Sequence, residues 1–121
     1  MMPGRTTWVF PDAERPPHGP GGELFGHESV IVLNQNPERA NVVATLWYSD
    51  REPETFEFGV EGERVRCLRT NEPADMGGIE VKVGEQYAIS LTSDLPVVAQ
   101  YGRLDVRQPE MAFYTTPGYN E

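Results

Sequence analysis

Short segments in which every second side chain is apolar recur along this chain, with turn residues between them. Because successive side chains of a β-strand point to opposite faces of a sheet, this spacing predicts strands. The 11 prolines and 12 glycines are about a fifth of the 121 residues and supply the turns. Strands are expected at residues 6–10, 27–34, 41–48, 55–60, 64–69, 87–92, 97–104 and 111–116. This pattern predicts an all-β, single-domain sandwich of the jelly-roll type, with about eight strands and little or no helix.

The connections between these strands are expected to include two hairpin turns and one long loop. The sequence QNPERA at residues 35–40 is turn-like, as is Glu61-Gly62-Glu63, and each is predicted to close a hairpin. Residues 12–26 contain three prolines and four glycines, which predicts a long surface loop. Loops of this length inside compact domains are usually functional or disordered.

The charge balance narrows the range of partners. The chain has 19 acidic and 10 basic residues, for a formal net charge of −9. Such a surface repels nucleic acids and anionic membranes. No segment approaches the ~18 consecutive apolar residues of a membrane span, and the first residues do not resemble a signal peptide. We therefore expect a cytoplasmic protein without direct membrane insertion.

The single cysteine and the two histidines offer little chemistry. Cys67 lies in the strand-like sequence VRCLR, where a buried, inert thiol is expected. His18 and His27 stand in no spacing suited to a metal, and no nucleophile motif accompanies them. The sequence therefore predicts no cofactor, no metal site and no enzyme activity.

The sequence PVVAQYGRLDVRQ at residues 96–108 has an apolar start followed by a charge at every second position. Continued as a strand, it would place Arg103, Asp105 and Arg107 on one face. Two guanidinium groups around a carboxylate suit a polyhydroxylated or anionic ligand. An ion-pair ladder, within the chain or between subunits, explains the same pattern, and the sequence leaves both interpretations open.

Other polar residues are predicted to complete this site. Glu28 shares a face with the apolar side chains of its strand and is expected to point inward, where Arg69 or Arg103 would pair with it. Tyr48 and Asp50, in the sequence YSDREP, offer a stacking platform and a hydroxyl acceptor, although such residues also cap turns. The predicted ligand-binding residues are Arg103, Asp105, Glu28, Asn34, Tyr48, Asp50, Arg69 and Arg107.

Two strands, at residues 27–34 and 41–48, are apolar on both faces. In a small domain, the second face needs a covering layer. Another copy of the chain is the simplest source, and one long loop covering the same surface is the alternative. We therefore expect a homo-oligomer, with Trp8 and Trp47 in the core or at an interface.

Several sequence segments resemble the sensory rhodopsin transducer family. They are YSDREP, PVVAQ and RLDVRQ, together with the early Trp8, the strand HESVIVLN and the pair Arg69 and Asn71. The resemblance extends from Trp8 to Tyr119. It implies a small soluble β-sandwich that assembles as a homotetramer, binds a small molecule such as a sugar and acts downstream of a membrane photoreceptor.

The expected function is therefore a non-enzymatic signal-transducing and ligand-binding module. One alternative is a transcriptional regulator that binds promoter DNA, which would need an assembly that gathers Arg64, Arg66 and Arg69 into one basic face. Another is a structural tetramer without a ligand.

Overall fold

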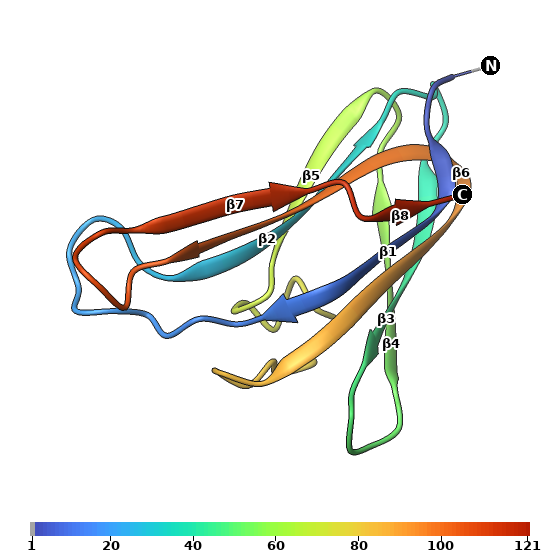
Figure 1. Cartoon of the computed structure of the whole chain (residues 1–121). Coiled ribbons are helices and arrows are strands. Elements are labelled where there is room, and N and C mark those ends of the chain that lie inside the picture. The colour runs from blue at the N-terminus through green and yellow to red at the C-terminus, as the bar shows by residue number, and fades with distance from the viewer. Residues whose placement is uncertain (1) are drawn as a thin grey trace.

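The computed structural model describes residues 2–121, which form eight β-strands and no helix (Figure 1). The predicted all-β class is confirmed, and the arrangement is that of a β-sandwich. The strands are β1 (Arg5–Glu14), β2 (His27–Asn34), β3 (Ala40–Trp47), β4 (Glu54–Val60), β5 (Arg64–Arg69), β6 (Gln86–Asp105), β7 (Ala112–Thr116) and β8 (Tyr119–Asn120).

The twenty-residue strand β6 connects two antiparallel layers. Its first half pairs with β1 and β3, and its second half pairs with β2 and β7. We call these layers the first and second sheets. β4 and β8 extend the first sheet, and β5 extends the second. Figure 1 shows the bend of β6 as it passes from one sheet to the other.

The sequence predicts two strands where β6 is continuous. Pro96 lies at the bend, between Ser93, which pairs with β3, and Val97, which pairs with β1. Its missing N–H therefore interrupts no pair in either ladder.

Both hairpin predictions are wrong. β2 pairs with β5 and β6, whereas β3 pairs with β4 and β6, so residues 35–40 carry the chain from the second sheet to the first. Glu61, Gly62 and Glu63 likewise connect β4 in the first sheet to β5 in the second. Turn residues specify a reversal of the chain but not which strands pair after it.

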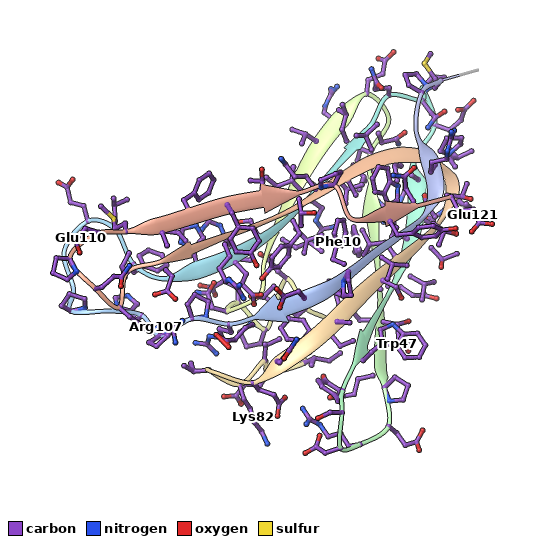
Figure 2. The ribbon with its side chains drawn as sticks, in the orientation of Figure 1. Phe10, Trp47, Lys82, Arg107, Glu110 and Glu121 are labelled. Atoms are coloured by element: carbon purple, nitrogen blue, oxygen red, sulfur yellow. The ribbon has the colours of Figure 1, made fainter. Side chains whose placement is uncertain are left out.

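The core lies between the two sheets. Phe10, Val30, Leu46, Ile89 and Tyr101 are fully buried there, and Figure 2 shows Phe10 in the space between the layers. Glu28, which the sequence predicts to point inward, is fully buried as well.

The outward faces of both sheets keep apolar side chains exposed. Trp47 is 48% exposed on the first sheet, and Figure 2 shows it beside β3. On the second sheet Val65 is 63% exposed, and Cys67 is exposed as well. The expectation of a buried Cys67 is wrong, because its register partner Ile31 also lies on the outward face.

Candidate functional site

A row of polar side chains crosses the second sheet near one end of the sandwich. Glu28 of β2 lies opposite Arg103 of β6, and Arg103 lies opposite Tyr114 of β7. One step further along the strands, Val30 lies opposite Tyr101, and both are fully buried. Since side chains two residues apart share a face, the row faces the interior, at the rim of the core.

Glu28 is the buried member of this row. Its Oε1 accepts hydrogen bonds from Thr70 Oγ1 and from the Tyr87 hydroxyl, both at 2.8 Å. Its Oε2 accepts from the backbone N–H of Glu14 at 2.9 Å and from the Tyr101 hydroxyl. Four donors from β1, β6 and the end of β5 therefore satisfy one buried carboxyl group.

The predicted pairing of Glu28 with an arginine is wrong. Arg69 lies opposite Ser29, so its side chain falls on the other face of the sheet from Glu28. Its backbone N–H donates to Asp75 Oδ2 at 2.9 Å. Hydroxyl groups satisfy the carboxyl group without the cost of desolvating a guanidinium group.

The tyrosines around Glu28 are held in their neutral form. Burial raises the pKa of Tyr87 well above its usual value, and the neighbouring Glu28 raises it further. Burial and Glu28 raise the pKa of Tyr101 in the same way. Both phenols therefore remain hydrogen-bond donors at neutral pH.

Arg103 is half-buried and keeps most of its donors unused. Its Nη1 donates to the Glu14 carbonyl at 3.4 Å, and its guanidinium carbon lies 4.8 Å from the ring centroid of Tyr114. Among residues 2–121 it forms no salt bridge with a carboxylate. The Tyr114 hydroxyl beside it is buried and has no hydrogen-bond partner among these residues.

Asp105 and Arg107 form a local pair beyond this row. β6 ends at Asp105, so the three charges do not continue along a strand as predicted. Instead the Arg107 N–H and Nε donate to Asp105 at 2.9 and 2.8 Å, and Arg107 also approaches Glu14 at 3.7 Å. The hydrogen bonds from Arg107 lower the pKa of Asp105. An ion pair within the chain therefore accounts for two of the three charges.

The long loop meets the end of β6 next to this pair. β1 continues to Glu14, so the predicted loop of residues 12–26 begins only at Arg15. Residues of this loop and of the connection from β6 to β7 line an open groove of about 410 Å³. Leu24, Val106 and Met111 are among its lining residues. Figure 2 shows Arg107 and Glu110 at this end of the molecule.

Asn34 lies at the other end of β2 from Glu28, about 20 Å away at the usual rise of a strand. Its Nδ2 donates to the carbonyls of Glu38 and Val60 at 2.8 and 3.0 Å, and its Oδ1 accepts from the Asn36 N–H at 3.0 Å. It therefore fixes the crossing between the sheets and does not belong to the polar row.

Tyr48 and Asp50 form a separate group in the connection from β3 to β4. Arg51, which is not among the predicted site residues, lies with its guanidinium carbon 3.6 Å from the Tyr48 ring centroid. It donates to Glu85 at 2.6 Å and to Asp50 at 3.0 Å. Within the described residues, no hydrogen bond joins this group to the row, so the structure brings together Glu28, Arg103, Asp105 and Arg107 but not all eight candidates.

Four residues of the site are absent from the sequence prediction: Thr70, Tyr87, Tyr101 and Tyr114. Tyr87 and Tyr101 do carry a signal, because each occupies an inward position of an alternating strand. A buried tyrosine hydroxyl requires a hydrogen-bond partner, which here is Glu28.

Within residues 2–121, no helix is long and apolar enough to cross a membrane. The same residues contain no group of three or more His, Cys, Asp or Glu side chains arranged to hold a metal ion.

Comparison with known proteins agrees with this architecture. The chain is similar to a solved structure titled "Crystal Structure of Thermotoga maritima 1070", with 32% identity, a TM-score of 0.88 and coverage of 99% of this chain and 97% of that one. It is also similar to the Anabaena sensory rhodopsin transducer, with 32% identity, a TM-score of 0.71 and coverage of 84% and 96%. No curated protein matches the chain. The family model described as Anabaena sensory rhodopsin transducer matches residues 3–120, and the chain therefore belongs to that family.

Proposed function

We propose that this chain is a non-enzymatic signal transducer that binds a small polar ligand, sugar-like or anionic, at the rim of its core. Membership of the transducer family supports the signalling role. By analogy with the relative named a sensory rhodopsin transducer, its upstream partner would be a membrane photoreceptor and its location the cytoplasm.

The observation that carries the ligand proposal is the state of Arg103. A half-buried guanidinium group normally pairs with a carboxylate, because planar, bidentate contacts compensate for its desolvation. Within the described part of the chain, Arg103 forms one long hydrogen bond and packs on the aromatic ring of Tyr114, whose hydroxyl has no hydrogen-bond partner there. Hydroxyl or carboxylate oxygens of a ligand would accept hydrogen bonds from both groups.

The ligand would reach the rim from the end where the long loop meets β6. Asp105 and Arg107 stand at that end and supply an acceptor and a donor for hydroxyl groups. Glu28 lies deeper and is fully engaged by four donors, so we assign it the role of holding Tyr101 and Tyr87 in place. Asn34, Tyr48, Asp50 and Arg69 fall outside the proposed site.

We further propose that copies of the chain assemble as a tetramer through the outward face of the second sheet. Ile31 and Leu33 of β2 are only half-covered there, and Val65 and Phe113 are 63% and 69% exposed. An apolar sheet face of this kind is typical of a subunit interface.

Thermal-shift measurements with sugars, hydroxy acids and small dicarboxylic acids test the ligand proposal. A specific ligand stabilises the folded state and raises the melting temperature with increasing concentration. Arg103→Gln should abolish that rise in melting temperature. Arg5→Gln is the control and should retain the rise, because the exposed Arg5 side chain donates to the Gly4 carbonyl and lies outside the proposed site. A ligand whose effect survives Arg103→Gln would refute this placement of the site.

A further inference from the structure

A second site lies near the end of β2 that carries Asn34, away from Glu28 and the rim of the core. From its residues we infer that a depression between β4 and β5 binds the phosphate group of a small anion. The depression has a volume of about 390 Å³. Its lining residues are Arg39, Gly59, Val60, Glu61, Arg64, Val65 and Arg66.

The charge of this depression contrasts with that of the whole chain. Three of the ten basic residues line it together with one acidic residue, although the chain as a whole carries a charge of −9. Arginine groups that converge on a concave surface are suited to phosphate, because their planar donors match its oxygens in pairs.

Two of these arginines contact Gly59. A Cβ atom at Gly59 would collide with the guanidinium group of Arg39, so the glycine leaves the space that this group occupies against β4. Arg66 Nη1 donates to the Gly59 carbonyl at 2.8 Å. Both guanidinium groups therefore lie against the same part of β4.

The guanidinium groups retain donors for a ligand. The Arg64 side chain donates to the Glu63 carbonyl at 2.9 Å and forms no salt bridge within the described residues. Arg66 forms no salt bridge there either, and its guanidinium carbon lies 5.6 Å from the Phe58 ring centroid.

Glu61 occupies part of this site as an internal anion. Its carboxylate forms a salt bridge with Arg39, and both side chains are more than half exposed, at 65% and 52%. Exposed pairs of this kind contribute little to stability, so a dianionic phosphate group can displace the carboxylate.

The ligand is a small molecule rather than a nucleic acid. Binding to duplex DNA requires many phosphates to be neutralised along an extended basic surface. Here the three arginines line a single depression and not an extended surface. Four carboxylates lie in or near the same segments and would repel the further phosphates of a nucleic acid: Glu38, Glu57, Glu61 and Glu63.

Titration with inorganic phosphate and glycerol phosphate tests this inference, with affinity measured by calorimetry and contacts mapped by the arginine Nε–H signals in NMR. We expect saturable binding that shifts the signals of Arg64 and Arg66. Loss of a charge-assisted contact in Arg64→Gln should weaken binding about tenfold or more. Glu61→Gln should strengthen it about two- to fivefold, by removing the competing carboxylate.

Arg5→Gln is the matched control, because it removes one exposed positive charge elsewhere. Circular dichroism of each variant verifies that it is folded. Equal weakening by Arg64→Gln and Arg5→Gln, or the absence of binding, would overturn the inference. Shifts confined to Arg103 would also overturn it, and would assign the phosphate to the rim of the core instead. If duplex DNA binds to these arginines and inorganic phosphate does not compete with it, the inference is also overturned, and the arginines bind a nucleic acid.

Discussion

Glu28 and Arg103 lie directly opposite each other on neighbouring strands, yet their charged groups do not pair. Three hydroxyl groups and one backbone N–H satisfy the carboxyl group, and the guanidinium group turns toward Glu14 and Tyr114. This separation leaves Arg103 with donors at the rim of the core. The proposed ligand site depends on it.

Replacing Glu28 should show how much its buried network stabilises the fold. Glu28→Ala removes the acceptor of four hydrogen bonds and leaves a cavity, so we expect the free energy of unfolding to fall by about 3 kcal/mol or more. Glu28→Gln retains the shape and one acceptor oxygen and should cost less. Urea denaturation measures both, with the exposed Glu52→Ala as a control expected within about 0.5 kcal/mol of the parent. Equal stability of the two alanine variants would contradict the assigned role.

Alkaline titration should report on the tyrosines. The pKa of each of the five tyrosines is raised. Burial is the largest cause for Tyr48, whose pKa is raised to about 12, and also for Tyr87, Tyr101 and Tyr114. For Tyr119 the largest cause is its hydrogen bond to Glu121. A raised pKa means that the folded state favours the neutral phenol. The resulting stabilisation is complete below pH ~10, the ordinary value, and is lost as the pH rises above it.

The ultraviolet absorbance of tyrosinate and circular dichroism, recorded together, test this prediction. Tyr87 and Tyr101 should ionise only as the chain unfolds, so the part of the absorbance change that belongs to these two of the five tyrosines should coincide with loss of structure. In urea, the same tyrosines should titrate near the ordinary value. Full ionisation of a folded chain near pH ~10 would be incompatible with the buried network.

A charge on the outward face of the second sheet should disrupt the proposed assembly. In Val65→Glu, a carboxylate would be buried at the subunit contact without a partner, which is strongly unfavourable. We expect light scattering after size-exclusion chromatography to show a tetramer for the parent chain and a smaller species for the variant. Val83→Glu is the matched control, since Val83 is 51% exposed and lies outside the strands. If the two variants assemble alike, the contact lies elsewhere.

Gly118 should tolerate no side chain. It has φ +65°, and a Cβ atom there would collide with the Val9 carbonyl and the Phe10 ring. Gly118→Ala should therefore lower the melting temperature more than Gly84→Ala, which has a similar φ of +78° but nothing within 4 Å of the added atom. The backbone strain alone costs about 1–2 kcal/mol, so the difference between the two variants measures the close approach.

The sequence predicts the strands better than their partners. The bounds of β2 and β5 agree with the expected segments, because a short run with apolar and β-branched residues between turn residues is a local signal. Pairing depends on contacts between distant segments, which is why the two expected hairpins are instead crossings between sheets. Around Pro96 the sequence predicts two strands, whereas β6 is continuous there. No local feature of the sequence distinguishes a bend within one strand from a break between two strands.

The same limit applies to the site. The inward direction of Glu28 follows from its position in β2, but its partners Tyr87 and Tyr101 are 59 and 73 residues away along the chain. The charges of Arg103, Asp105 and Arg107 suggested one continuous ladder. β6 ends at Asp105, and Arg107 bonds back to Asp105. The end of a strand depends on its pairing with distant segments, which the charge pattern alone does not specify.

The shared strand β6 has a mechanical consequence. Neither sheet can separate from the other as an intact unit, because the same strand, β6, is a central strand of both sheets. Unfolding should therefore proceed in a single concerted step. For the same reason, a displacement imposed at Arg103 is transmitted along one backbone to the layer that carries Trp47, with no flexible linker between them.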